Sequence, residues 1–369
     1  MKIVLIGPVY PYRGGIAHFT TALAGELLRA GHQVQVISFA RQYPAWLYPG
    51  KSDKDPSLQH EQVEARYLLD PLYLWTWRRA LSAIYVFQPD LVIAQWWTTF
   101  WSLAYAHLGT ALRRRGIPLV FCIHNVLPHE NRLPDRALAR WVLGKGSGYI
   151  TFSPKETGRL EGLLAHPRVF AARLPVPRLP HTRLDPADAR RALQIPPDQP
   201  TLLFFGIVRP YKGLSVAIEA LSLLKKEPLR PTLLVAGEFW EDEEKYRRQI
   251  EQLGLGAQVK IDARYIPNEE LETFFRAADG FVAPYLNGTQ SAAIKTAMSY
   301  GLPILASDQI ASDLPADDYP ILIHRAGDAA QLAGHMRACI QQDWPGQPAR
   351  AMDDWSSLVA LIEQIRGRL

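Results

Sequence analysis

The feature that most constrains the fold of this chain is the alternation of short apolar runs with longer segments of helical periodicity. In the N-terminal half the apolar runs are Lys2–Ile6, Gln33–Phe39, Asp90–Ala94, Pro118–Ile123 and Gly148–Phe152. Buried parallel strands have this composition, and crossover helices account for the longer segments between them. The pattern predicts an α/β fold with a parallel sheet.

The same alternation restarts after a Pro-rich stretch at residues 174–180. The later runs are Thr201–Gly206, Thr232–Gly237, Val259–Asp262, Gly280–Ala283 and Pro303–Ala306. A chain of 369 residues favours two domains, which we place at residues 1–178 and 179–350. Open α/β sheets bind ligands beyond the carboxyl ends of their strands, so we expect a ligand cleft between the two sheets. The last helix, within residues 351–369, either packs back against the first domain or covers the second sheet.

Composition excludes several classes of protein. Hydrophobic residues make up 48% and charged residues 21%, as in an ordinary globular protein, which excludes disordered and collagen-like chains. The two cysteines, Cys122 and Cys339, have no CxxC partner. A disulfide framework and a structural zinc site are therefore excluded, and a reducing compartment is expected.

The charge is divided unevenly along the chain. Residues 1–178 carry 21 basic and 11 acidic side chains, whereas residues 179–369 carry 20 and 25. Seven of the ten tryptophans also lie in the basic half. Anionic lipid headgroups would suit Trp75, Trp77, the arginines 78, 79 and 113–115, and the loop Tyr43–Tyr48. The alternative is that the aromatic residues belong to the core or to an acceptor pocket and that the arginines form a solvated face.

The start of the chain does not resemble a secretory signal, because Lys2–Ile6 is too short for the apolar region of a signal peptide. No uninterrupted apolar run approaches the roughly 20 residues that span a bilayer. We expect a cytoplasmic protein, soluble or peripheral on the inner face of the membrane.

Three loops that follow predicted strands are suited to phosphate. Gly14 and Gly15 lie before the first helix, where free N–H groups and a close backbone approach favour an anion. The spacing differs from GxGxxG, which argues against a hydride-transferring Rossmann enzyme. A plain tight turn is the alternative.

The other two loops belong to the second half. Arg209 and Lys212 follow the strand at Thr201–Gly206 and can converge on one anion. A third loop carries Thr289, Gln290 and Ser291 before a helix of small residues, where hydroxyls and N–H groups again suit a phosphate. Surface charge and tight helix packing are the alternatives.

These segments resemble a known family. GPVYPYRGGIAHF at residues 7–19, GIVRPYKGLSVAIEAL at 206–221, VAGE at 235–238 and AMSYGLPILASD at 297–308 are similar, in order, to segments of the GT-B glycosyltransferases of the family 4 type, or glycosyltransferase group 1. The resemblance implies two Rossmann-like domains, the first binding mainly the acceptor and the second a nucleotide-sugar donor, with the last helix crossing back to the first. It also implies a retaining transfer of the sugar.

Carried over position by position, the resemblance assigns roles to individual residues. Arg209 and Lys212 match the basic pair that holds the donor diphosphate and stabilises the leaving group. His124, a catalytic candidate, matches the histidine-containing segment whose side chain or backbone touches the transferred sugar, and a structural histidine is the alternative. The resemblance implies donor contacts for Gly14, Gly15, Glu238, Thr289, Gln290 and Ser291, and we expect acceptor contacts from Asn125, Trp96 and Trp97.

The chain departs from the family at two positions. Many members carry two glutamates that here correspond to Gly288 and Thr296, so the chain resembles a variant with a Thr-Gln-Ser turn instead. Donor-sugar and nucleotide recognition cannot be inherited from the two-glutamate members. Two further hypotheses therefore stay open: a non-catalytic subunit that binds nucleotide sugar or glycan, and a GT-B sugar-nucleotide epimerase.

The sequence contains no DxD motif at a strand end, so we expect no metal and no cofactor beyond the nucleotide-sugar substrate. The leading hypothesis is a retaining glycosyltransferase of cell-envelope or exopolysaccharide synthesis, with a glycan or lipid-linked acceptor. An anionic membrane surface is a further expected partner, and nucleic acid is not expected.

Overall fold

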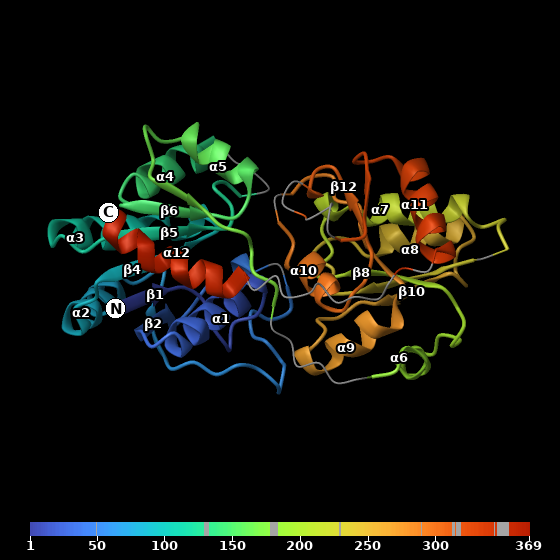
Figure 1. Cartoon of the computed structure of the whole chain (residues 1–369), viewed down its shortest axis with the longest axis horizontal. Helices are drawn as coiled ribbons and strands as arrows, with labels where there is room; N and C mark the ends of the chain where they lie inside the picture. Colours follow the sequence, from blue (N-terminus) through green and yellow to red (C-terminus); the bar gives the residue numbers. More distant parts are fainter. Residues whose placement is uncertain are drawn as a thin grey trace. The chain divides into compact units, whose positions relative to one another are not determined.

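The computed structural model describes residues 1–48, 50–128, 133–177, 184–228, 230–288, 290–311, 314, 319–342, 344 and 354–369. They form two compact units (Figure 1). Unit 1 contains Met1–Asp55, His60–Pro175 and Asp353–Leu369, and unit 2 contains Pro56–Gln59 and Val176–Met352. The change of unit at Pro175 lies within the Pro-rich stretch.

Unit 1 is built on a seven-stranded parallel sheet of order β3-β2-β1-β4-β5-β6-β7. Its strands are β1 (Lys2–Ile6), β2 (Gln33–Phe39), β3 (Ala65–Leu69), β4 (Leu91–Trp96), β5 (Leu119–Ile123), β6 (Gly148–Thr151) and β7 (Val169–Ala171). Its helices are α1 (Gly15–Arg29), α2 (Leu74–Phe87), α3 (Ser102–Arg114), α4 (Leu133–Leu143), α5 (Pro154–Glu161) and α12 (Asp354–Arg368), with short 3-10 helices η1 (Ala45–Leu47) and η2 (Thr99–Trp101).

The sheet of unit 1 is covered on both faces because its strands are apolar on both. Ile3 and Leu5 of β1 pack in one core cluster with α1 and α12, whereas Val4 and Ile6 pack on the other face with α2 and α3. In Figure 1, α12 lies across the sheet beside α1. Its Trp355 ring is 5.5 Å from that of Phe19 on α1.

Unit 2 repeats this architecture on a six-stranded parallel sheet of order β10-β9-β8-β11-β12-β13. Its strands are β8 (Thr201–Phe205), β9 (Thr232–Ala236), β10 (Val259–Asp262), β11 (Gly280–Ala283), β12 (Ile304–Ser307) and β13 (Ile321–His324). Its helices are α6 (Pro186–Ala192), α7 (Leu214–Leu223), α8 (Glu244–Gln252), α9 (Asn268–Ala277), α10 (Ala292–Ser299) and α11 (Ala329–Gln341), with the 3-10 helix η3 (Pro210–Lys212). The two α/β domains with parallel sheets that the sequence predicts are confirmed.

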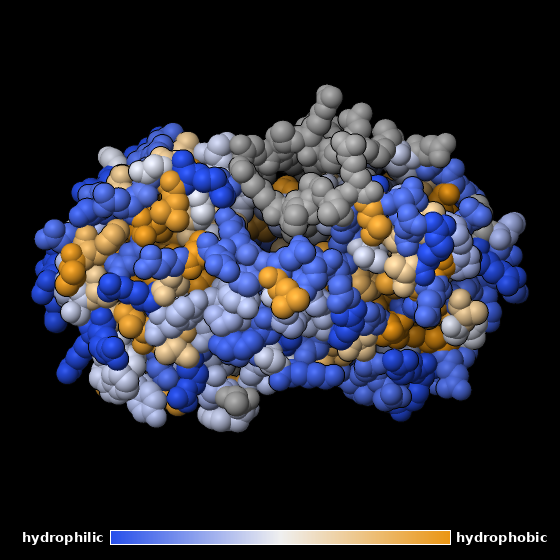
Figure 2. Space-filling view, turned by 90° about the horizontal axis from the view of Figure 1, so that it is seen from below, coloured by the Kyte–Doolittle hydropathy of each residue, from blue (hydrophilic) through white to orange (hydrophobic). Residues whose placement is uncertain are grey.

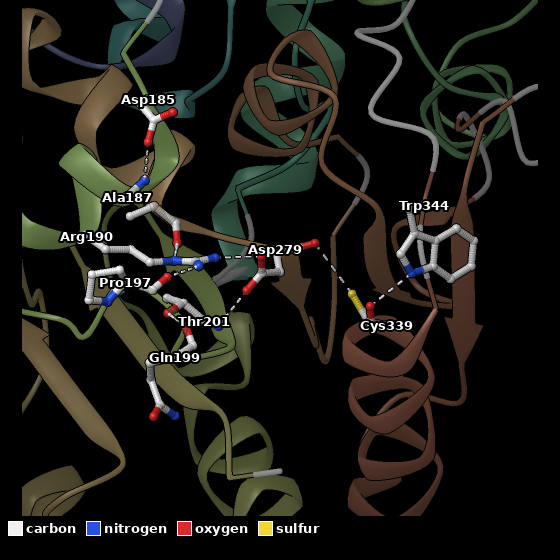
Figure 3. Close-up of polar contacts among 10 residues, drawn as sticks. Asp185, Ala187, Arg190, Pro197, Gln199, Thr201, Asp279, Cys339 and Trp344 are labelled. Carbon is white, nitrogen blue, oxygen red and sulfur yellow. Dashed lines mark hydrogen bonds and ion pairs between the residues drawn. The ribbon is translucent and has the colours of Figure 1, made fainter.

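A polar cluster fixes the amino ends of two strands in unit 2 (Figure 3). Asp279, just before β11, accepts a hydrogen bond of 2.8 Å from the backbone N–H of Thr201. It also forms an ion pair of 2.6 Å with Arg190 on α6. Arg190 also donates to the carbonyl oxygens of Ala277 and Pro197. Because these contacts lie at the amino ends of the strands, they leave the carboxyl ends for the candidate site.

Candidate functional site

The loop after β8 is the centre of the candidate site in unit 2. Arg209 precedes the short helix η3, and the backbone N–H of Lys212 donates to the carbonyl oxygen of Arg209 over 2.9 Å. Gly213 follows with a φ of 72°, and a Cβ atom there would lie 2.1 Å from the carbonyl oxygen of Pro284. The turn therefore requires glycine, and it holds both cations at the carboxyl end of the sheet.

The electrostatics of this loop suit an anion. Burial lowers the pKa of Lys212 from 10.5 to about 8, and the charge of Arg209 acts in the same direction. The lysine is still mostly protonated at neutral pH, but its charge is poorly solvated. Aromatic rings flank both cations: the guanidinium of Arg209 is 5.3 Å from the Trp240 ring, and the ammonium of Lys212 is 5.7 Å from the Tyr285 ring. A bound phosphate would supply a negative charge beside the two cations, which compensates for the water that burial removes from Lys212.

Glu238 lies next to this loop, after β9. Its carboxylate is buried and accepts a hydrogen bond of 3.0 Å from the indole N–H of Trp240. Its carbonyl oxygen accepts from the N–H of Val208 over 2.8 Å. Gly237 has a φ of 151°, and a Cβ atom there would lie 2.0 Å from the carbonyl oxygen of Gly206. The ends of β8 and β9 are therefore closely packed, and Glu238 holds the tryptophan that faces Arg209.

The amino end of α10 completes the site in unit 2. Ser291 caps the helix, accepting from the N–H of Ile294 over 3.3 Å, and its hydroxyl is 3.0 Å from that of Tyr285. The N–H of Leu286 donates to the carbonyl oxygen of Tyr211 over 2.7 Å, which fastens this segment to η3. Gln290 is half-buried beside the cap. Thr289, the remaining residue of the predicted turn, lies outside the described residues.

Gly288 and Thr296 stand at the two positions where members of the resembling family carry glutamates. The hydroxyl of Thr296 donates to the carbonyl oxygen of Ala292 over 3.0 Å, within α10. A Cβ atom at Gly288 would lie 3.0 Å from Ile310 Cδ1, closer than most side chains accept. A larger side chain at position 288 would thus require its neighbour to move.

In unit 1, Gly14 and Gly15 form the start of α1. Gly14 has a φ of 101°, while a Cβ atom there would meet no other atom within 4 Å. The loop is held from outside by residues 53–55: Arg13 N–H donates to the carbonyl oxygen of Asp53 over 3.1 Å, and Asp55 is 2.9 Å from His18 Nε2. These contacts hold the glycine loop with open space in front of Gly14.

His124 lies at the carboxyl end of β5, beside this helix. Its Nε2 is 2.7 Å from Gln95 Oε1 at the end of β4, and its ring is edge-on to Phe19 of α1. Burial lowers the pKa of His124 from 6.5 to about 3, so the imidazole is neutral at physiological pH. When Nε2 donates to Gln95, Nδ1 is the acceptor. Sequence reasoning missed Gln95, although a polar residue at the end of the apolar run Leu91–Trp96 was a usable signal.

The three predicted acceptor residues differ in how much of their surface is exposed. Asn125 and Trp97 are half-buried, and the indole N–H of Trp97 donates to the hydroxyl of Tyr43 over 2.9 Å. Trp96 is fully buried, with its indole N–H on the carbonyl oxygen of Val126. The structure does not support a direct acceptor contact for Trp96, because its whole ring is in the core. Trp77, expected on a lipid-facing surface, is also a core residue, with 4% of its surface exposed.

The described residues also bear on the expectations about metal and membrane. Among these residues, no group of three or more His, Cys, Asp or Glu side chains is placed to hold a metal ion. None of the helices found there is long and apolar enough to cross a membrane. The expectation of a metal-free site stays a prediction.

Comparison with known proteins identifies the family. The sequence model described as "Glycosyl transferases group 1" matches residues 185–347, and that described as "Glycosyltransferase Family 4" matches residues 13–171. The chain is 25% identical over 276 residues to D-inositol 3-phosphate glycosyltransferase of Actinosynnema mirum, a match that covers 69% of this chain and 62% of that protein. It is 26% identical over 254 residues to GDP-mannose:glycolipid 4-beta-D-mannosyltransferase of Xanthomonas campestris pv. campestris, covering 63% of this chain and 67% of that protein.

A solved structure of similar fold is that of Anabaena Alr3699/HepE in complex with UDP. It has a TM-score of 0.71 at 18% identity, covering 100% of this chain and 99% of that one. The two family models occupy the two units in order, and the fold agrees with both. The chain therefore belongs to the GT-B glycosyltransferases of the family 4 type, glycosyltransferase group 1.

Proposed function

We propose that the chain is a retaining glycosyltransferase that moves a sugar from a nucleotide-diphosphate-sugar donor to a glycan or lipid-linked acceptor in cell-envelope or exopolysaccharide synthesis. The observation that carries the proposal is the pair Arg209 and Lys212, held by a glycine-dependent turn at the carboxyl end of β8. The names of the relatives, which include a glycosyltransferase acting on D-inositol 3-phosphate and a mannosyltransferase acting on a glycolipid, agree with this class of reaction.

The proposed reaction places its largest charge change on the leaving group. The bond between the anomeric carbon and the diphosphate oxygen breaks, the acceptor oxygen bonds to that carbon on the same face, and the acceptor proton passes to the leaving phosphate. Negative charge grows on the phosphate as its bond breaks. Two fixed cations stabilise that charge more in the transition state than in the bound donor, and this difference accelerates transfer.

The same cations underlie our proposal that no metal ion is needed. Arg209 offers a planar fork of donors and Lys212 a point charge, while the amino end of α10 adds N–H groups. Together they supply the positive field that a divalent ion supplies at other diphosphate sites. In unit 1, we propose that Gly14, Gly15 and the neutral His124 contact the transferred sugar, and that Asn125 and Trp97 contact the acceptor.

The first test is nucleotide binding in the presence of EDTA. UDP, GDP and ADP are each added to the purified protein, and thermal unfolding is followed. We expect one of them to stabilise the fold by about 2.7 kcal/mol when its concentration is a hundred times its dissociation constant. Absence of stabilisation by all three nucleotides would reject the donor site.

The second test is slow hydrolysis of the corresponding nucleotide sugars. Arg209→Ala and Lys212→Ala should each lower turnover by roughly 10²- to 10³-fold, as the loss of a transition-state donor does in other enzymes. Lys226→Met is the matched control, since Lys226 is an exposed lysine of the same unit. Nucleotide binding without any turnover would favour the alternative of a non-catalytic binding subunit, which the missing glutamates at positions 288 and 296 support.

A further inference from the structure

The start of α2 exposes a continuous run of large apolar side chains. Leu72, Tyr73, Leu74 and Trp75 have 54%, 45%, 63% and 56% of their surface exposed. The next residues of the helix turn inward, and Thr76, Trp77 and Ala80 are buried. A single exposed leucine is ordinary, but a contiguous apolar patch on a soluble protein commonly marks an interaction surface. We call these four residues the α2 tip.

The α2 tip is held in place by polar contacts beneath it. Asp70 accepts from the N–H of Leu72 over 2.9 Å, and its carbonyl oxygen accepts from the indole N–H of Trp77 over 2.7 Å. Its carboxylate also pairs with Arg41 at 3.1 Å. The exposed side chains therefore sit on an ordered turn, so the cost of ordering them on a partner is small.

Three arginines lie near the tip. The guanidinium of Arg79 is 6.0 Å from the Trp75 ring, and that of Arg41 is 5.8 Å from the Tyr73 ring. Arg78 is also exposed, and α2 contains no acidic residue. The only carboxylate in these contacts, that of Asp70, is buried and paired with Arg41. In Figure 2, hydrophobic residues form patches among hydrophilic ones over unit 1, on the left.

We propose that the α2 tip docks unit 1 onto an anionic lipid surface. Leucine side chains and aromatic rings enter the boundary between headgroups and acyl chains, while the arginines around them remain among the lipid phosphates. The charge of Arg78 and Arg79 beside the apolar side chains complements anionic headgroups, and this complementarity favours a lipid surface as the partner. Docking would bring the enzyme to a lipid-linked acceptor. This role of docking rests on the proposed function, whereas binding to the lipid surface itself does not.

The test is co-sedimentation with vesicles in the absence of donor and acceptor. One set of vesicles contains 30 mol% phosphatidylglycerol in phosphatidylcholine, and the other contains phosphatidylcholine alone. We expect the unmodified chain to bind the anionic vesicles at least tenfold more tightly, with binding that weakens as salt is raised. No binding to the anionic vesicles at low salt would overturn the proposal.

Two double variants divide the surface into its parts. Leu74→Ser with Trp75→Ser removes the apolar tip, and Arg78→Gln with Arg79→Gln removes charge. Each should weaken binding at least tenfold. Val86→Ser is the matched control, since Val86 is exposed near the other end of α2, and it should change binding less than twofold. If the tip variant binds as the unmodified chain does, the apolar residues have no part in docking and the proposal fails.

A fluorescent probe and the oligomeric state complete the test. Cys122 and Cys339 are both buried, so an environment-sensitive dye on Leu74→Cys labels the tip selectively. Its emission should shift to shorter wavelength on anionic vesicles, and an unchanged spectrum would contradict insertion. If light scattering shows a dimer that the tip variant abolishes, the surface is an interface between two copies and the proposal is wrong. Nucleotide binding is unaffected by these outcomes, so docking and donor recognition fail separately.

Discussion

A glycine loop lies at the carboxyl end of each sheet, but the basic side chain beside it is neutral in unit 1 and cationic in unit 2. In unit 1 a glycine loop leads into α1 beside His124, and in unit 2 a glycine loop leads into η3 with Lys212. Burial depresses the pKa of both side chains, to about 3 for His124 and to about 8 for Lys212. Because they start at 6.5 and 10.5, one ends neutral and the other cationic at physiological pH. The same desolvation thus makes one edge suited to an uncharged sugar and the other to a diphosphate.

Two glycines at these edges, Gly14 in unit 1 and Gly237 in unit 2, differ in how much space surrounds them. A Cβ atom at Gly14 would meet nothing within 4 Å, whereas at Gly237 it would lie 2.0 Å from a backbone oxygen. At Gly14 glycine is required by its dihedral angle alone. At Gly237 it is required by both angle and packing, which fixes the ends of β8 and β9 beside the two cations.

The largest expected effect follows from that packing. Gly237→Ala should destabilise the chain by about 3 kcal/mol or more, because neither the φ of 151° nor the contact with Gly206 can be relieved without moving a strand. Urea unfolding measures the change. Gly256→Ala is the control, since a Cβ atom there meets nothing within 4 Å. Equal unfolding curves for the two variants would show that packing does not require glycine at position 237.

The neutral imidazole predicts a pH dependence of stability. The unfolded state binds a proton with a pKa near 6.5 and the folded state only near 3, so stability is lost as pH falls below 6.5. This residue alone should remove about 2 kcal/mol between pH 7 and pH 5. His124→Gln should unfold with a shallower pH dependence over that range. Parallel stability curves for the two proteins would show that His124 is not desolvated.

Protonated Lys212 predicts that donor binding depends on pH, and that affinity falls as pH rises. A bound diphosphate favours protonated Lys212, so affinity should fall as pH rises through about 8. We expect about a tenfold loss between pH 7 and pH 9, measured by calorimetry with a nucleotide sugar. Lys212→Arg keeps its charge throughout this range and should show a flat profile. If the unmodified chain is equally flat, the charge on Lys212 does not hold the donor.

The smallest expected effect is at Gly14, where backbone strain and a role in turnover can be measured separately. Gly14→Ala should cost about 1 kcal/mol of stability, because alanine tolerates a φ of 101° poorly. Gly31→Ala is matched to it, with a φ of 82° and open surroundings at the end of α1. Only Gly14→Ala should also lower turnover. An equal loss of turnover in both variants would indicate that the glycine loop has no special role.

Much of the fold was predictable from the sequence because buried parallel strands are apolar on both faces. The central strands β1, β8 and β11 lie within one residue of the predicted ranges. The missed strands are the short edge strands β3, β7 and β13, most of whose residues are partly exposed. The apolar run at the start of β13 was a usable signal. Helices α4, α5, α6 and α11 were not among the predicted crossover helices. Helices α5 and α6 are short and carry few apolar residues, whereas the buried positions 329, 332, 333, 336 and 339 of α11 were a usable helical signal.

The sequence by itself predicted the alternation of central strands and helices, the family and the cations at the strand end, because periodicity, glycine spacing and residue type are local properties. Only the tertiary structure decided that α12 packs on α1, that Trp96 and Trp77 belong to the core and that Lys212 is desolvated. Those facts depend on residues distant in sequence that surround each side chain. Burial, unlike charge, is a property of the neighbours rather than of the residue.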